Sequence, residues 1–186
     1  MSNSTNAKLL NIRLIGDEVL RQVAKDVTKF DAELHSFLED LTHTMYITDG
    51  VGLAAPQVGV SKRIFVIDYE WSEEDGRKNP QVYINPKITS EEGSDINEEG
   101  CLSLPEVYDK IRRPDSITIT AQDKTGKSFT KKFEGFPAVV FQHENDHLDG
   151  TLFVDHLSKL KLMIHKPKIN KIKSTTDEKG QNIQER

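Results

Sequence analysis

The run Q-H-E-N-D-H at residues 142–147 constrains this chain more than any other feature of its sequence. It is an H-E-x-x-H motif, in which His143 and His147 lie four positions apart with Glu144 between them. On an α-helix that spacing amounts to about 40° of rotation and about 6 Å of rise, so both imidazoles can bind one metal ion. Glu144 then has its carboxylate near the open coordination position. Chance produces the motif in roughly one or two such sequences per hundred, so it needs a third ligand and an oxyanion site to support it.

The hydrophobic pattern predicts separate helices and mostly antiparallel strands. Apolar residues at helical spacing predict a helix over residues 31–46, and alternation predicts a β-hairpin of residues 116–121 and 128–133. Helices and strands do not alternate in βαβ units, so the fold class is α+β. We expect one domain with mostly antiparallel sheets around a central metal-binding helix, and a C-terminal helix. The other expected elements are a short helix at 17–24, strands at 63–68 and 81–85, a helix at 137–150 and a last helix at 154–165, which Pro167 ends or kinks.

Length and composition favour a single domain. A chain of 186 residues can form one substantial core, and we expect the domain to cover residues 1–174. Residues 175–186 are polar and are predicted to be a disordered tail. The net charge of −5 argues against a protein that coats nucleic acid over its whole surface. No apolar stretch approaches the roughly 20 residues of a transmembrane helix, and no targeting signal is seen, so we expect a cytoplasmic protein without membrane contact.

Two further segments accompany the histidine run. Residues 50–57 read G-V-G-L-A-A-P-Q, and residues 99–103 read E-G-C-L-S and contain the only cysteine, Cys101. Together with the histidine run they resemble the three signature segments of the peptide deformylases, G-x-G-x-A-A-x-Q, E-G-C-x-S and H-E-x-D-H. All three are complete, in the family's order and at compatible spacing. The resemblance implies a metal-dependent hydrolase that removes the N-formyl group, as formate, from the N-terminal formylmethionine of newly synthesised proteins.

The resemblance also implies a metal centre made by Cys101, His143 and His147. A thiolate and two imidazoles suit zinc, nickel, cobalt and iron(II), and the family is expected to use iron(II) in the cell. The fourth position is left for water, whose pKa falls from about 15.7 towards about 7 on a metal ion. By resemblance, this water attacks the formyl carbon while Glu144 acts as general base and then as general acid.

The other site residues follow from the same resemblance. The Gln57 side-chain amide and the Leu102 backbone N–H bind the oxyanion. Apart from the resemblance, we expect Glu99 to orient the cysteine segment or the substrate amine, with an ordinary helix or loop acid as the alternative. The main chain of Val51 and Gly52 pairs with the bound peptide as an added strand. The residues that wall the methionine pocket are Phe136, Val139 and Val140.

Each of these assignments has a simpler structural alternative. The glycines at 50 and 52 could be turn residues, and Gln57 could be a surface amide. Two other functions are also compatible with the histidine run: an HExxH metallopeptidase of another family, and a non-enzymatic module with a structural metal. Such peptidases usually find their third ligand downstream of the helix, and structural sites close all four positions. Here the best third ligand is the upstream Cys101, and no fourth has suitable spacing.

The C-terminal stretch carries a run of lysines without an acid among them. Its composition is typical of a solvated charged segment, and alternatively of an electrostatic contact to RNA. In related bacterial enzymes a C-terminal helix docks at the ribosome. The resemblance therefore implies two partners: nascent N-formylmethionyl polypeptides and, through this segment, the ribosome. The lysines are Lys159, Lys161, Lys166, Lys168, Lys171 and Lys173.

Overall fold

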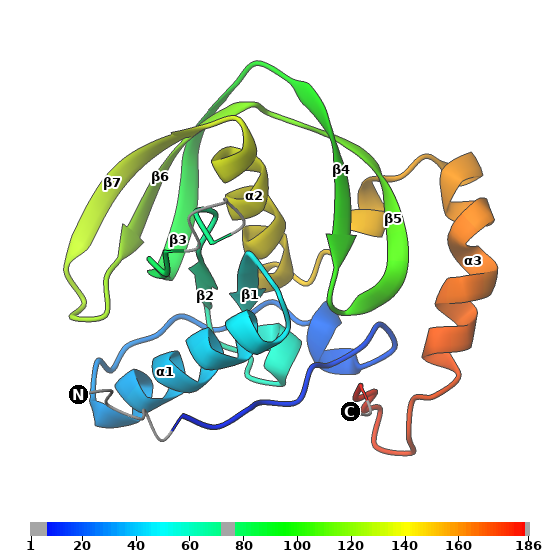
Figure 1. Ribbon diagram of the computed structural model, residues 1–186, viewed down its shortest axis with the longest axis horizontal. Coiled ribbons are helices and arrows are strands. Elements are labelled where there is room, and N and C mark those ends of the chain that lie inside the picture. Colours follow the sequence, from blue (N-terminus) through cyan, green and yellow to red (C-terminus); the bar gives the residue numbers. More distant parts are fainter. Residues whose placement is uncertain (1–6, 72–76, 185–186) are drawn as a thin grey trace.

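Two antiparallel sheets lie on either side of helix α2 in this computed structural model, which describes residues 7–71 and 77–184 (Figure 1). The larger sheet has the strand order β1-β2-β3-β6-β7, and the smaller one pairs β4 with β5. The strands are β1 (Gly52–Ala54), β2 (Ile64–Ile67), β3 (Gln81–Glu92), β4 (Asp95–Cys101), β5 (Leu104–Arg113), β6 (Ser116–Gln122) and β7 (Ser128–Glu134). The helices are α1 (Ala32–Ile47), α2 (Phe136–Leu148) and α3 (Lys159–Lys173), with 3-10 turns at Glu18–Arg21, Ala55–Val58 and Phe153–His156.

Helix α2 is fixed by packing against the larger sheet. Pro137 lies in its first turn, where the missing N–H breaks no helical hydrogen bond. Phe141 packs edge-on against Phe65 and Tyr83, with ring centroids 5.0 and 5.2 Å away. His143 and His147 lie roughly 200° and 240° around the helix from Phe141, so they face away from this aromatic cluster.

The α+β prediction is confirmed: the chain forms one domain of antiparallel sheets with a C-terminal helix. The expected helix at 31–46 is α1, whose N-terminus is capped by the Asp31 side chain accepting from the Leu34 N–H. The expected hairpin is β6 and β7, paired from Ser116↔Glu134 to Gln122↔Ser128.

The hydrophobic pattern does not predict β4 and β5. Strand β4 reads D-I-N-E-E-G-C, and its only large apolar side chain, that of Ile96, is 47% exposed, so the strand has no apolar face. Its strand conformation depends on the pairing with β5, which runs from Asp95↔Arg113 to Cys101↔Leu104. Pairing between strands is a long-range contact that single-segment patterns do not report.

The predicted bounds of the last helix, 154–165, are wrong. Helix α3 runs from Lys159 to Lys173 with Pro167 inside it. A proline removes one helical hydrogen bond and crowds the preceding turn, so the helix needs tertiary support to continue past it. Ile169 supplies part of that support, since it is 5% exposed and packs in the core beyond the proline.

In the described part of the chain, no helix has the length and apolarity that spanning a membrane requires.

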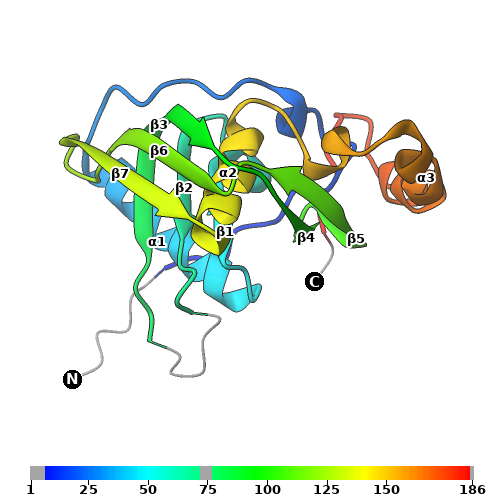
Figure 2. The same ribbon diagram turned by 90° about the horizontal axis from the view of Figure 1, so that it is seen from above.

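Ion pairs hold α3 against β5 at one end of the molecule (Figure 2). Asp109 of β5 accepts from Lys161 Nζ at 2.5 Å and lies 2.8 Å from His165 Nε2. The Lys168 ammonium lies 3.0 Å from a carboxylate oxygen of Glu106. The hydrogen bond from Lys161 is the main reason that the pKa of Asp109 falls to about 2.

Asp109→Asn is expected to lower the melting temperature by an amount that depends on pH. The pKa of Asp109 is depressed in the folded state, from its ordinary 3.8 to about 2, so its contribution is complete above about pH 4 and is lost as the pH falls towards 2. Melting curves of wild type, Asp109→Asn and the exposed control Asp95→Asn between pH 2 and 7 measure this. A wild-type advantage over Asp109→Asn that stays constant down to pH 2 would contradict the prediction.

The C-terminal segment, predicted to be a disordered tail, has defined contacts as far as Gln184. Asn182 is 1% exposed, and its carbonyl accepts from the Leu14 N–H at 2.6 Å. Arg13 and Ile183 form an isolated antiparallel bridge. The polar composition of the C-terminal segment does not indicate these contacts, because they are made by backbone groups and by one buried amide.

Candidate metal centre

Three side chains from two elements meet at one point. Helix α2 carries His143 and His147, and Cys101 is the last residue of β4. Their ligand atoms all lie within 4.8 Å of one another, and Cys101 Sγ is 3.3 Å from His147 Nε2. A thiolate and two imidazoles at this separation form the donor set of a tetrahedral metal site with one open position.

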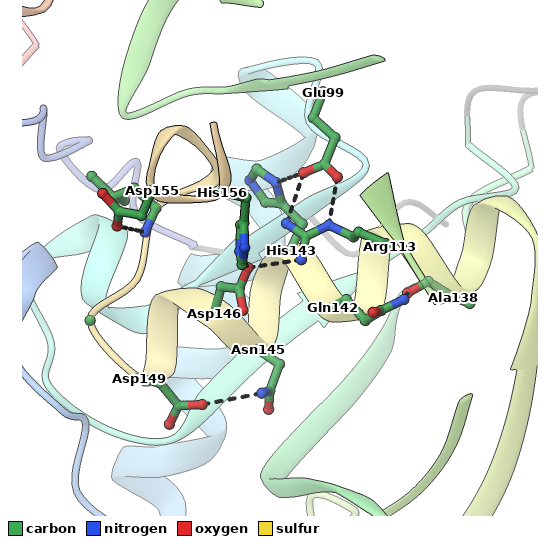
Figure 3. A network of polar contacts seen from close by, with 12 residues as sticks. Glu99, Arg113, Ala138, Gln142, His143, Asn145, Asp146, Asp149, Asp155 and His156 are labelled. Carbon is green, nitrogen blue, oxygen red and sulfur yellow. Dashed lines mark hydrogen bonds and ion pairs between the residues drawn. The ribbon is translucent and has the colours of Figure 1, made fainter. Parts of the chain in front are cut away.

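Glu99 orients His143 (Figure 3). The Nδ1 of His143 lies 2.9 Å from Glu99 Oε2, so the ring donates Nδ1–H to the carboxylate and turns Nε2 towards Cys101. Burial lowers the pKa of His143, but hydrogen bonds with Cys101 and Glu99 outweigh burial and raise it well above 6.5. Metal binding at this ring therefore releases a proton. Burial holds the pKa of His147 well below 6.5, which favours the neutral, metal-binding form.

Arg113 holds Glu99 in place through a buried two-point ion pair. Its Nε and Nη2 lie 2.5 and 3.0 Å from the two carboxylate oxygens, and the two side chains are only 5% and 4% exposed. Burial raises the pKa of Glu99, but the hydrogen bonds from His143 and Arg113 bring it down to about 2. Glu99 is therefore ionised, and its negative charge favours the Nδ1–H tautomer of His143.

The ion-pair network continues from Arg113 across α2 (Figure 3). Arg113 Nη1 donates to Asp146 Oδ2 at 2.9 Å, and the same oxygen lies 2.7 Å from Nε2 of the half-exposed His156. Arg113 and His156 are not among the residues predicted for the site. In the structure Arg113 lies on the same buried face of β5 as Val107 and Ile111, a placement that the sequence could indicate only if the strand itself had been predicted. A charged residue in an alternating buried pattern needs a buried partner.

Glu144 is buried beside the three candidate ligands. It is 4% exposed, and its Oε2 has no hydrogen-bond partner among the described residues. Burial raises its pKa to about 7. The carboxylate lies against Gly52 of β1, where an added Cβ would be 2.5 Å from Glu144 Oε1. Gly52 is therefore required for the close approach of Glu144, which is a different role from that of a turn glycine.

The amide of Gln57 is held at both of its ends. Its Oε1 accepts from the Ala54 N–H at 2.9 Å, and its Nε2 lies 3.4 Å from Cys101 Sγ and 3.3 Å from Ser103 Oγ. Gln57 is 2% exposed, so it is not a surface amide. Its amide nitrogen is therefore directed towards Cys101 and Ser103. Ser103, which was not assigned a role from sequence, is fully buried and helps to set this orientation.

A pocket of about 430 Å³ opens onto the centre. Val139 and Val140 are both 5% exposed, whereas Phe136 is 51% exposed. His147 is the one predicted site residue that does not line the pocket. A larger hollow of about 910 Å³, between α1 and strands β3 and β7, contains none of the predicted site residues. The predicted residues that line the smaller pocket are Val51, Gly52, Gln57, Glu99, Cys101, Leu102, Phe136, Val139, Val140, His143 and Glu144.

The chain is similar to known proteins over most of its length. The family model for polypeptide deformylase matches residues 9–163. A peptide deformylase of Chromobacterium violaceum is 45% identical over 163 residues, which cover 88% of this chain and 95% of that relative. The crystal structure of a peptide deformylase from Legionella pneumophila is 44% identical, has a TM-score of 0.82, and covers 90% of this chain and 96% of its own. One from Synechococcus elongatus in complex with actinonin is 40% identical, with a TM-score of 0.82 and coverage of 89% and 90%.

The α+β fold and a Cys-His-His donor set beside a buried glutamate define a metal-dependent hydrolase. The matches all point to one family within that class. The chain belongs to the polypeptide deformylase family, and it is an enzyme that removes the N-formyl group from newly made polypeptides. An HExxH metallopeptidase of another family is not favoured.

Proposed function

We propose that Cys101, His143 and His147 hold one divalent metal ion, and that this ion is iron(II) in the cell. The observation that carries the proposal is the convergence of the three ligand atoms within 4.8 Å. The carboxylate of Glu99 on His143 Nδ1 supports it, because metal-binding histidines commonly donate their second ring N–H in this way. Zinc, nickel and cobalt also suit this donor set. When bound, the metal supplies a Lewis acid that makes water a nucleophile at neutral pH.

Glu144 is proposed to move the proton. Its buried Oε2 has no partner among the described residues and is an acceptor next to the three proposed ligands. A carboxyl with a pKa near 7 can take a proton from water and return it to the departing amine at the same pH. Gly52 keeps the carboxylate in this position.

The Gln57 amide and the Leu102 backbone N–H are proposed to stabilise the negative oxygen that develops on the formyl group. Two observations support Gln57: its Oε1 is fixed by Ala54, and its Nε2 is aimed at the Cys101 sulfur. A donor that is held in place before the reaction needs no reorganisation when charge develops. Losing such a donor costs about 3 kcal/mol of transition-state stabilisation.

The substrate is proposed to lie along β1, with its methionine side chain against Val139 and Val140. Strand β1 is at the edge of the larger sheet, so the main chain of Val51 and Gly52 can pair with an extended peptide. The two valines give an apolar wall suited to an unbranched thioether side chain, and Phe136 closes its exposed side.

The iron proposal has a direct test. Protein prepared without oxygen from its own cells is expected to contain iron and to release formate from a formyl-Met peptide but no acetate from an acetyl-Met peptide. Air should inactivate the iron form, because a thiolate-bound ferrous ion is readily oxidised, and should spare the same protein reloaded with nickel. Metal analysis and formate assays before and after exposure measure both effects. Equal loss in the iron and nickel forms would argue against iron.

Helix α3 is proposed to contact the ribosome. Lys161 and Lys168 are used in the contact with β5, but Lys166 and Lys171 are exposed and form no ion pair among the described residues. Reversing the charges of Lys166 and Lys171 is expected to weaken co-sedimentation with ribosomes, most strongly at low salt, and to leave hydrolysis of a free formyl-Met peptide unchanged. Reversal of Lys124 and Lys127, exposed at the β6–β7 turn, is the matched control. Equal ribosome binding by both double variants would contradict the proposal.

The family match over residues 9–163 supports two coarser proposals. The domain that carries the metal-binding and proton-transfer residues lies within residues 1–174, and the enzyme works in the cytoplasm, where formylated chains are made. Recovery of the enzyme in the membrane fraction of lysed cells would count against the second.

A further inference from the structure

The segment after α3 folds back onto the body of the protein. A turn closes at Asp177, whose carboxylate accepts from the Lys179 and Gln181 N–H groups at 2.9 and 2.8 Å. The Gly180 N–H donates to the Asp177 carbonyl at 3.1 Å. The chain then returns towards the N-terminal segment, and Figure 1 shows its last described residues below β4 and β5. The turn therefore reverses the chain and directs its last described residues towards the catalytic body.

Asn182 fixes this returning segment. Its backbone N–H donates to Asp17 Oδ2 at 3.1 Å, and its side-chain Nδ2 donates to the carbonyls of Ile15 and Ile172 at 3.1 and 2.7 Å. Its Oδ1 accepts from the Thr175 hydroxyl at 2.8 Å. With the carbonyl bonded to the Leu14 N–H, every polar group of this buried residue has a partner. A fully satisfied buried amide specifies one position for the chain.

The bonds of Asn182 hold the chain so that Gln184 lies at the substrate pocket. The Gln184 N–H donates to the Ile12 carbonyl at 2.9 Å, two residues beyond Asn182, and Gln184 lines the same pocket as Cys101, His143 and Glu144. The N-terminal segment that receives the tail is itself tied to the oxyanion side of the site, because the Arg13 N–H donates to the Gln57 carbonyl at 2.7 Å. The family match ends at residue 163, so the part of the pocket wall that Gln184 forms lies outside the matched region.

We propose that Gln184 is a specificity-determining residue that hydrogen-bonds the peptide backbone of the substrate beyond its formylmethionine, and that Asn182 positions it. A primary amide offers two donors and an acceptor, which match the N–H and C=O groups of an extended peptide. It does not match the apolar methionine side chain, for which Val139 and Val140 are available. The inference rests on the proposed substrate orientation and adds the C-terminal segment to the substrate site.

The test compares two substrates and four variants of the full chain. One substrate is a formyl-Met tripeptide, and the other is formyl-Met amide, which has no residue for Gln184 to bind. Gln184→Ala is expected to raise KM for the tripeptide roughly two- to tenfold, the worth of a neutral hydrogen bond, with kcat unchanged. KM for formyl-Met amide should not change. Gln181→Ala, an exposed glutamine in the same segment, is the matched control.

Asn182→Ala is expected to raise the tripeptide KM to the same level, and adding Gln184→Ala to it should raise it no further. Calorimetry with the unformylated product tripeptide tests the same contact without turnover, and Gln184→Ala should weaken binding by the same factor. The proposal is overturned if Gln184→Ala and Gln181→Ala have equal tripeptide KM and product affinity, or if the KM effect is equal for both substrates. Failure of wild type to release formate from either substrate would instead count against the proposed catalytic roles.

Discussion

Glu144→Gln is expected to lower kcat for formate release by about 10²- to 10⁴-fold, the usual contribution of a positioned general acid–base. The substitution keeps the size and shape of the side chain, so its packing on Gly52 is retained. It removes the one buried carboxylate oxygen in the site that has no partner among the described residues. An amide cannot accept the proton from water and cannot return it to the amine. The loss should therefore be in kcat, with KM for a formyl-Met peptide little changed.

Metal content and melting temperature are the controls for that experiment. Both should match wild type, because Glu144 is not one of the three converging ligands. Glu91→Gln, an exposed acid on β3, controls for the change in charge. Undiminished activity in Glu144→Gln would remove this residue from the mechanism. Loss of the metal together with activity would mean that Glu144 supports binding of the ion rather than proton transfer.

Arg113→Met is expected to destabilise the protein by about 3–5 kcal/mol, the usual cost of leaving one partner of a buried ion pair alone. Methionine fills much of the same volume, so the loss is mainly electrostatic. Without the guanidinium, the buried carboxylate of Glu99 keeps only His143 as a charged or hydrogen-bonded partner, and Asp146 keeps only His156. The variant should also release its metal faster to a chelator, because His143 is oriented through Glu99.

Arg112→Met is the matched control, since Arg112 is the preceding residue of β5 but is exposed, and its side chain bonds only to Ser94 among the described residues. Urea unfolding at pH 7 in excess metal gives the free energies of both variants. Adding Glu99→Gln to Arg113→Met should recover part of the stability, because it removes the unpaired charge. Equal unfolding midpoints for Arg113→Met and Arg112→Met would show that the buried ion pair has no stabilising role.

Elements that depend on contacts between residues close in sequence could be predicted, and elements that depend on contacts between distant residues could not. Helices α1 and α2 and the β6–β7 hairpin could be predicted, because capping, apolar spacing and turn residues act within a few positions of one another. Strands β4 and β5 could not, because the polar β4 depends on its neighbour for its conformation. The end of α3 was misplaced because the support beyond Pro167 comes from Ile169 in the core and from the Lys168 ion pair with Glu106 of β5, which are contacts with residues distant in sequence.

By itself, the sequence determined that His143, Glu144 and His147 share one helix, because residues four apart are neighbours in any α-helix. The approach of Cys101 to these histidines was implied only by resemblance, and the tertiary structure alone places its sulfur 3.3 Å from His147. The fold also decided that Arg113 fixes Glu99, that Gly52 makes room for Glu144, and that the tail reaches the pocket. These contacts join segments far apart in the chain. A pattern of residues within one segment does not indicate which buried charge, which glycine or which polar tail contacts the site.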